Sequence, residues 1–253
     1  MIDPLPSVLA DGGLLVCFLV PVVVAVFGAI MFAAYKAEQR RRAAFEAAAA
    51  ELGLHYDPSS QGDWDARWPQ FECFQRGHSR RAFNILSGRL GADGPQCALG
   101  EYEFRETHGS GKNRRTVTYR FGFTIIDSGY TGIPDMLIRQ ENLLDKVAGF
   151  LGFDDIDFES VEFSKRYMVK CSDKRFAYDL IDAQMMEFLL HEGTPNIDLG
   201  GGAFCLWVGQ NVRLEPPELV SLGRWGLAFL ERWPRVLRAE LDERRGRAEE
   251  GSR

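Results

Sequence analysis

One uninterrupted apolar stretch near the N-terminus constrains this sequence more than any other feature. Residues 14–35 read LLVCFLVPVVVAVFGAIMFAAY and contain no charged side chain. As an α-helix these 22 residues would extend about 33 Å, enough to cross the hydrocarbon core of a bilayer. Strands do not reach this length, and membrane helices tolerate a proline such as Pro21. The sequence therefore predicts one transmembrane helix at residues 14–35.

The charges on the two sides of this stretch predict its orientation. Residues 1–13 contain two aspartates and no Lys or Arg, unlike the basic start of a secretory signal peptide. Basic residues follow the stretch, so the positive-inside rule predicts a short extracytoplasmic N-terminus and a cytoplasmic C-terminal domain. These residues could also contact anionic lipid headgroups. The predicted membrane interface consists of Tyr35, Lys36, Arg40, Arg41 and Arg42.

Residues 36–53 predict a basic helical stalk because they are rich in Ala, Glu, Gln and Arg. Gly53 followed by Leu54 is typical of a helix end at which glycine adopts a left-handed conformation. The apolar stripe of the stalk is thin, with Phe45, several alanines and Leu52. Such a stripe could pack on the following domain, lie on the lipid surface, or pair with a second copy to form an oligomer.

Residues 54–245 predict one soluble α+β domain, in which an antiparallel sheet is packed by helices on one face. The first half alternates apolar and polar residues in short segments, which predicts a four-stranded meander. A turn at residues 109–113 would join its last two strands. These strands are expected at residues 71–74, 82–86, 97–107 and 116–126.

The second half of the domain mixes helical and strand-like patterns. Ser172 or Asp173 can cap a helix, and Pro234 should interrupt the last one. After residue 245 we expect a charged disordered tail, residues 246–253. Helices are expected at residues 142–151, 174–190 and 216–245, and strands at residues 163–170 and 203–208.

Charge is unevenly distributed along the domain. Residues 135–162 carry eight acidic and two basic side chains, a balance of 2 − 8 = −6, whereas residues 76–120 carry nine basic and four acidic ones, a balance of 9 − 4 = +5. The domain would thus present two electrically different sides. Two ordinary solvated faces would explain the same charges. The residues that would form one basic interaction surface are Arg76, Arg80, Arg81, Arg114 and Arg115. A solvated, charged sheet edge explains them as well, and nucleic acid is not the expected partner.

No motif in the sequence predicts catalysis, a cofactor or a metal site. Gly111-Lys112 lacks the remaining residues of a phosphate-binding loop, and the glycines at 200–202 read as a turn between strands. The acidic residues 154–159 lack the spacing of a calcium loop. The four histidines have no ligand spacing, and the five cysteines form no Cys-x-x-Cys pair, so we expect reduced thiols.

Several short strings together resemble a known type of protein. They are Phe74-x-Arg76-Gly77, Asn84-Ile85-Leu86-Ser87-Gly88, Glu101-Tyr102 and Phe163-Ser164-x-Arg166-Tyr167, placed after a membrane span and a basic stalk. This arrangement resembles a family of uncharacterised bacterial single-pass membrane-anchored proteins with a domain of unknown function. The resemblance implies a bacterial source and an inner-membrane location, and it carries over no catalytic residue.

These observations favour a membrane-tethered cytoplasmic module that binds or scaffolds an unidentified protein partner. Two alternatives remain open. One is an enzyme that acts at the membrane surface with a site assembled from scattered residues. The other is a structural anchor that oligomerises through its stalk.

Overall fold

The computed structural model shows two compact units, Met1–Ala44 and Phe45–Arg253. The second unit thus begins inside the predicted stalk. The helix predicted at residues 142–151 lies outside the described residues. The structure describes residues 10–91, 93–140, 153–191, 194–209 and 211–251.

The helix α1 (Ala10–Leu52) contains both the predicted span and the predicted stalk without a break. Side chains 19–35 of α1 are all exposed, as Phe27 illustrates at 64% exposure. A helix that is apolar all round needs an apolar environment, and this composition is typical of a membrane span. Within the described part of the chain, α1 is the one helix long and apolar enough to cross a membrane.

The C-terminal end of α1 belongs to the second unit and closes as the sequence predicts. Gly53 has a φ of +68°, and its N–H donates to the Ala50 carbonyl. The Leu54 N–H donates to the Ala49 carbonyl over 2.8 Å, which completes a Schellman motif. Phe45 is fully buried in the domain core and stacks on Tyr56 with 5.5 Å between ring centroids. The apolar stripe of the stalk therefore packs on the domain.

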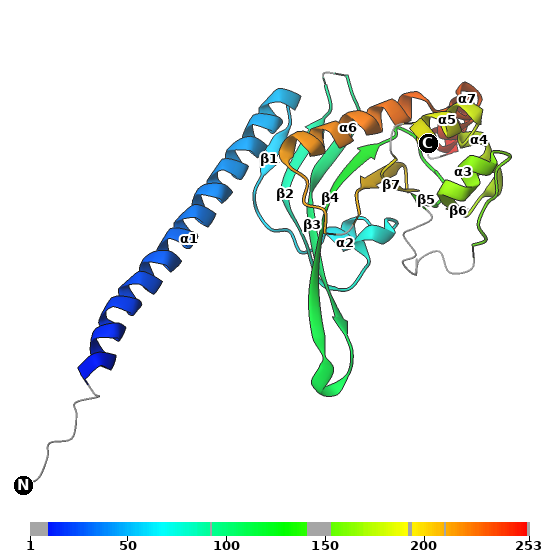
Figure 1. Cartoon of the computed structure of the whole chain (residues 1–253). Helices are drawn as coiled ribbons and strands as arrows, with labels where there is room; N and C mark the ends of the chain where they lie inside the picture. Colours follow the sequence, from blue (N-terminus) through cyan, green and yellow to red (C-terminus); the bar gives the residue numbers. More distant parts are fainter. Residues whose placement is uncertain (1–9, 92, 141–152, 192–193, 210, 252–253) are drawn as a thin grey trace, which may run out of the picture. The chain divides into compact units, whose positions relative to one another are not determined.

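The domain is built on one eight-stranded sheet in which all neighbouring strands are antiparallel, as predicted (Figure 1). The strand order is β1-β2-β3-β4-β8-β7-β5-β6, so the meander β2-β3-β4 lies toward one end and the β5-β6 pair at the other. The strands are β1 (His55–Asp57), β2 (His78–Arg89), β3 (Gln96–His108), β4 (Arg115–Asp127), β5 (Met136–Gln140), β6 (Tyr167–Cys171), β7 (Asn196–Gly200) and β8 (Ala203–Trp207).

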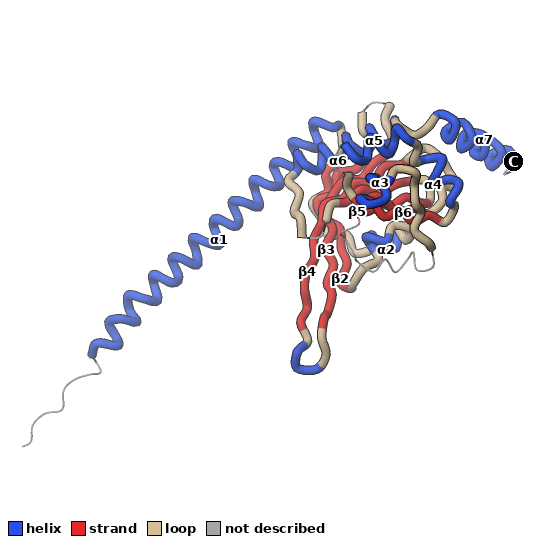
Figure 2. Tube along the Cα trace, turned by 45° about the vertical axis from the view of Figure 1, so that its right-hand side comes forward, coloured by secondary structure: helices blue, strands red, loops and turns tan. Residues whose placement is uncertain are grey.

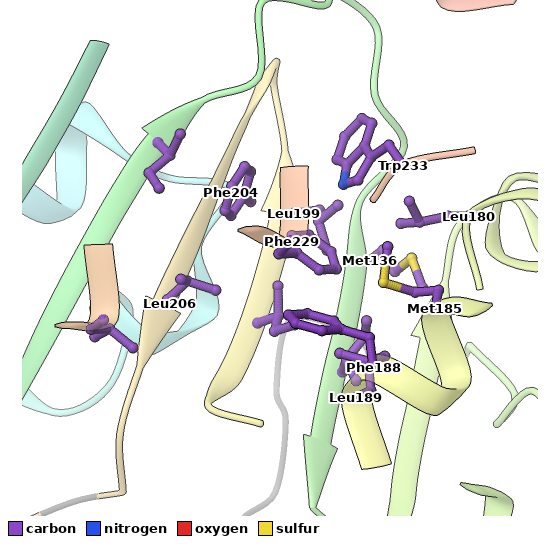
Figure 3. Packing of buried hydrophobic residues seen from close by; sticks show 14 of the residues in the cluster. Met136, Leu180, Met185, Phe188, Leu189, Leu199, Phe204, Leu206, Phe229 and Trp233 are labelled. Atoms are coloured by element: carbon purple, nitrogen blue, oxygen red, sulfur yellow. The ribbon is translucent and has the colours of Figure 1, made fainter. Parts of the chain in front are cut away.

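Helices cover one face of this sheet along most of its width (Figure 2). They bury a single core with that face, and Figure 3 shows Phe204 and Phe229 meeting at its centre. These helices are α3 (Val161–Arg166), α4 (Lys174–Leu180), α5 (Ala183–His191), α6 (Pro216–Glu231) and α7 (Arg235–Gly251).

Short elements cover the opposite face, where the sequence had not predicted any helix. They are α2 (Trp64–Arg67) and the 3₁₀ helix η1 (Glu72–Phe74). Trp64 and Phe74 pack there against Phe121 and Phe123, which alternate with residues of the first face along β4. The strand predicted at residues 71–74 is wrong, because the Phe74 N–H bonds locally to Phe71 and its carbonyl accepts from the Tyr102 hydroxyl.

The hairpin of β3 and β4 is the longest ladder of the sheet and was predicted at nearly its observed bounds. It pairs from Cys97 opposite Ile126 to His108 opposite Arg115, and its tip holds the 3₁₀ helix η2 (Gly111–Asn113). Figure 1 shows this hairpin extending beyond the other strands. The predicted turn at the glycines also exists: Gly201 and Gly202 both have positive φ and join β7 to β8.

Two predicted elements of the second half are divided in the structure. The strand predicted at residues 163–170 begins as α3, because the Ser160 side chain caps the Phe163 N–H and starts a helical turn. The helix predicted at residues 174–190 starts at its Asp173 cap but ends at Leu180. There Asp182 accepts a hydrogen bond from the Met185 N–H and starts a second helix. Beyond Pro234, α7 runs to Gly251 and includes most of the tail predicted as disordered.

Candidate functional site

A basic groove lies on the helix-covered side of the long strands, beyond the start of α6. Its side chains alternate with buried aromatic residues along β3 and β4, so they share one face of the sheet. It has a volume of about 410 Å³ and is lined by Arg81, Glu103, Arg105, Thr118, Arg120, Asn211 and Arg213.

Glu103 organises the centre of this groove. Its side chain is only 2% exposed, because the strand register places it between Arg81 on β2 and Arg120 on β4. Arg81 donates to one carboxylate oxygen over 2.9 and 3.2 Å, and Arg120 donates to the other. Both guanidinium groups also lie over the Phe83 ring. Their positions are therefore fixed before any ligand arrives, while about half of each side chain stays exposed.

A second buried carboxylate continues the groove toward α6. Glu101 accepts a 2.7 Å hydrogen bond from the Asn84 side chain, and Arg213 lies 3.6 Å from its other oxygen. The Tyr56 hydroxyl donates to Asn84, whose backbone has a φ of +53°. This network fixes Arg213 at the groove wall as Glu103 fixes the other two arginines.

The charge of the groove is positive overall. Four arginines and two glutamates line or support it, a balance of 4 − 2 = +2. Arg105 makes no ion pair among the described residues and is exposed. Guanidinium groups bind carboxylates and phosphates through paired N–H donors, and this geometry suits a small anionic group that enters the groove.

The structure separates the five arginines that the sequence suggested might form one surface. Arg81 lines the groove. Arg76 and Arg80 lie on the opposite face, where Arg76 lies over the Phe104 ring and Arg80 pairs with Asp65 at 3.0 Å. The remaining two, Arg114 and Arg115, lie at the hairpin tip.

The groove contains residues that sequence reasoning missed, namely Arg105, Arg120 and Arg213. A signal existed for the first two. Arg105 follows Glu103 by two residues, and Arg120 lies opposite Glu103, so a period-two reading of the hairpin would place them together. Arg213 lies outside the strands, and no local pattern places it here.

The two oppositely charged segments do lie at different ends of the sheet. The basic segment forms β2, β3 and β4, and the described acidic residues precede β6. Asp154 and Asp155 lie near Lys174 and Lys170, at 3.6 and 3.5 Å. The strand order thus gives the domain a basic end and an acidic end.

A buried ion cluster under η1 contains Arg139 and Asp198, the most deeply buried charged side chains among the described residues. Arg139 on β5 is 1% exposed and donates to Glu72 over 2.6 Å, with Asp198 at 3.5 Å. Although burial disfavours its charge, Asp198 and Glu72 raise the pKa of Arg139. Burial also raises the pKa of the neighbouring thiols Cys73 and Cys205, which therefore stay protonated. This cluster is closed to ligands and has a structural role.

A pocket of about 530 Å³ lies between the first turns of α6 and the ends of β5, β7 and β8. Its walls are largely apolar, with Leu214, Leu222 and Trp225 among them. Of its described lining residues only Glu218 is titratable, and that carboxylate accepts from the Glu215 N–H over 2.6 Å as part of the cap of α6.

One solved structure of a known protein is similar to this chain. No family model and no curated protein matches the sequence. The crystal structure of the mycobacterial trehalose monomycolate transport factor A, TtfA, matches with a TM-score of 0.53 and 11% sequence identity. The match covers 77% of this chain and 96% of that chain. At this identity the likeness shows a shared fold.

The residues predicted at the membrane interface all lie on α1, directly after its exposed apolar part. Tyr35 is 61% exposed, and the Lys36 ammonium lies 5.8 Å from the centre of the Phe32 ring. Arg42 pairs with Glu38 one helical turn earlier. The sequence of α1 thus passes from apolar to charged residues within two turns. Arg40 is exposed in this charged part, whereas Arg41 is buried, at 7% exposure.

Proposed function

We propose that this protein is a membrane-tethered module whose domain lies in the cytoplasm and binds an acidic segment of a protein partner in its basic groove. The observation that carries the proposal is the set of arginines held in place by the buried Glu103 and Glu101. A concave site with fixed guanidinium groups can enclose a carboxylate-bearing side chain, whereas a flat lipid surface fits it less well. The apolar α1 would hold the domain at a bacterial inner membrane, as the family resemblance implies.

The alternatives fit the structure less well. The apolar stripe of the stalk is taken up by the domain core through Phe45 and Ala49, which disfavours an anchor that oligomerises through that stripe. An enzyme would need converging titratable groups in a pocket. The pocket beside α6 offers Glu218, which is occupied as a helix cap, among its described lining residues.

Photo-crosslinking in living cells tests the binding site. A photoreactive residue at Thr118, inside the groove, should capture a partner, and the same residue at Val161, exposed near the acidic end, should not. Arg105→Glu should reduce the Thr118 crosslink at least tenfold, because it places a negative charge where the partner's acidic group would sit. Arg114→Glu makes the same charge change at the exposed hairpin tip and should leave the crosslink intact.

Other results would contradict this proposal. Equal capture by both variants would exclude the groove as the binding site. Vesicle flotation tests a lipid surface as the alternative ligand, with the anchor of every sample held in a neutral nanodisc. Flotation with anionic but not with neutral vesicles, lost in Arg105→Glu, would assign the groove to a lipid surface. Higher salt should weaken the true interaction, since the groove is open to solvent.

The topology is tested separately by labelling with a thiol reagent that cannot cross the inner membrane. Ser252→Cys should react only after the cells are opened. The unmodified chain is the matched control, because its four domain cysteines are buried and should react slowly. Labelling of Ser252→Cys in intact cells would overturn the cytoplasmic orientation.

A further inference from the structure

The β3-β4 hairpin is longer than the strands on either side of it. The pairing of β2 with β3 ends at Arg105, and β8 pairs with β4 only from Phe123 onward. Among the described residues, 106–108 and 115–119 therefore form a ribbon of two strands, which Figure 1 shows extending beyond the rest of the sheet. Two strands alone are marginally stable in water, so a third strand would stabilise this ribbon.

The outer edge of β4 offers backbone groups to such a strand. In an antiparallel strand the N–H and C=O of one residue point to the same side, and those of the next residue point to the other. The Arg120 carbonyl points to the outer side, where it accepts from the Asn211 N–H over 2.7 Å. The β3-β4 register has no bulge, so Thr118 and Thr116 direct their N–H and C=O the same way. Neither has a backbone partner there among the described residues, and this stretch is called the open edge.

The open edge borders the basic groove. Thr118 lines the groove together with Arg105 and Arg120. Every second side chain of a strand lies on the same face, so the Thr116 side chain also lies on the groove face. A strand added at the open edge would therefore place every second side chain of its own on the face that carries Arg105 and Arg120.

The charge beside the open edge decides which strand can bind there. Two copies of this chain paired across the edge would bring Arg115 and Arg120 of one copy close to those of the other, and like charges on paired strands are destabilising. An acidic segment would instead meet opposite charges. Arg105 is exposed and makes no ion pair among the described residues, so its guanidinium can bind a carboxylate. The charges therefore favour an acidic partner over a second copy.

The opposite face of the ribbon has a different character. Val117 and Tyr119 lie there and are half-buried, and the Tyr119 ring stacks on Phe104 with 5.2 Å between ring centroids. Apolar or β-branched side chains of an added strand would pack beside these residues. The two faces together select a segment in which acidic and apolar residues alternate.

We propose that the acidic segment of the partner binds in extended form, as an additional antiparallel strand at the open edge. Its main chain bonds to Thr116 and Thr118, its acidic side chains lie on the groove face, and its apolar side chains lie on the other face. In this mode of recognition the main-chain bonds supply affinity and the alternating side chains supply specificity. The inference rests on the proposed function and specifies how that partner binds.

Two synthetic heptapeptides of the same composition test the strand geometry. One alternates four Glu with three Val, and the other has the four Glu first and the three Val last, so both carry the same charge. Fluorescence anisotropy of the labelled peptides measures binding to the full chain in neutral nanodiscs. Only the alternating peptide can place all its carboxylates on the groove face, so we expect it to bind about 3–10-fold more tightly than the block peptide.

Methylation of peptide nitrogens tests the main-chain bonds without changing the protein. Directly paired residues of antiparallel strands share a face, so the Glu N–H groups of the alternating peptide should point to the open edge and the Val N–H groups to solvent. Methylating two Glu nitrogens should weaken binding about 3–10-fold, because two donors are lost. Methylating two Val nitrogens makes the same chemical change on the other side of the strand and should leave the affinity unchanged.

Variants of the protein test the open edge and the groove separately. Thr116→Pro removes an N–H from the open edge and should weaken the alternating peptide about 3–10-fold. Thr107→Pro is the matched control, because Thr107 lies directly opposite Thr116 and directs its N–H to the other side of the hairpin. Strands tolerate proline where the replaced N–H faces solvent. Arg105→Glu should weaken both peptides at least about tenfold, since both depend on the groove.

The strand proposal is overturned if the block peptide binds as tightly as the alternating one, or if Glu and Val methylation have equal effects. If Arg105→Glu still weakens both peptides in that case, the groove keeps its proposed function and only the added strand is refuted. No effect of Arg105→Glu would refute the proposed function itself. Self-association of the chain that is lost in Thr116→Pro would also overturn the proposal, because a second copy would then occupy the open edge.

Discussion

The buried cluster around Arg139 gives the sharpest test of how η1 is held against β5 and β7. Arg139→Met replaces the guanidinium by an uncharged side chain of similar length. Glu72 and Asp198 then remain buried, at 6% and 1% exposure, with no positive charge beside them. Asp198 keeps its bonds from the Cys73 N–H at 3.1 Å and the Trp207 indole at 3.2 Å. Glu72 loses the short bond that Arg139 provides.

The expected loss can be worked out from this geometry. Two unit charges about 4 Å apart attract by about 4 kcal/mol at an effective dielectric constant of about 20. Removing one partner of a buried pair typically costs about 3–5 kcal/mol, since the other charge is left uncompensated. We therefore expect Arg139→Met to lower the free energy of unfolding by about 3–5 kcal/mol. That is a large part of the roughly 5–15 kcal/mol that stabilises a typical domain.

Urea unfolding of the full chain in nanodiscs, followed by tryptophan fluorescence, measures this loss. Trp207 lies 4.9 Å from the Arg139 guanidinium carbon and reports on the cluster. Arg114→Met, at the exposed hairpin tip, is the matched control and should change stability by less than about 0.5 kcal/mol. The double variant Glu72→Gln/Arg139→Met should be less destabilised than the sum of its single variants.

Two results would refute this reasoning. A loss below about 1 kcal/mol for Arg139→Met would mean that the carboxylates find other compensation. Strict additivity in the double variant would mean that Glu72 and Arg139 do not interact energetically, whatever their distance.

Two further predictions concern the packing of α6 and the buried thiols. Gly226→Ala should destabilise the domain by about 1–3 kcal/mol in thermal unfolding, because the added Cβ would collide with the Ile126 side chain. Gly246→Ala has open space around it and should stabilise α7 by up to about 1 kcal/mol. Equal effects of the two variants would contradict this account. Burial raises the pKa of Cys97 and Cys171 from 9.0 to about 11, so the folded state retains protons that unfolded thiols release. Their contribution to stability is complete below pH 9 and should be lost as pH rises to 11. Replacing both by Ala should flatten this fall, and an unchanged pH profile would refute it.

Local patterns were sufficient to predict the elements that carry a distinct signal in the sequence, even though six consecutive residues are buried in each of β3 and β4. The α1 helix, its end at Gly53 and the β3-β4 hairpin follow from an apolar run, a glycine and strict alternation. The two strands β5 and β7 were missed for a physical reason. They lie inside the sheet with both faces covered, so nearly every residue is buried and no alternation appears.

Helix boundaries failed where one polar side chain decides between continuing and restarting. Asp182 accepts from the Met185 N–H and ends what reads as one amphipathic helix. The Ser160 hydroxyl starts a helical turn inside a segment whose composition is typical of a strand. Helix and strand propensities are summed over a window of residues. At a helix start, the hydrogen bond from one capping side chain outweighs that sum.

The basic groove shows a different limit, which concerns how residues gather into a site. Arg80 and Arg81 are adjacent in the sequence, and a strand directs adjacent side chains to opposite faces. They accordingly pair with Asp65 on one face and Glu103 on the other. A run of basic residues on a strand therefore predicts two half-sites rather than one surface. The residues that complete each half-site come from the neighbouring strand, from the positions that pair with it, as Arg120 pairs with Glu103. The strand register must therefore be known before the site can be predicted.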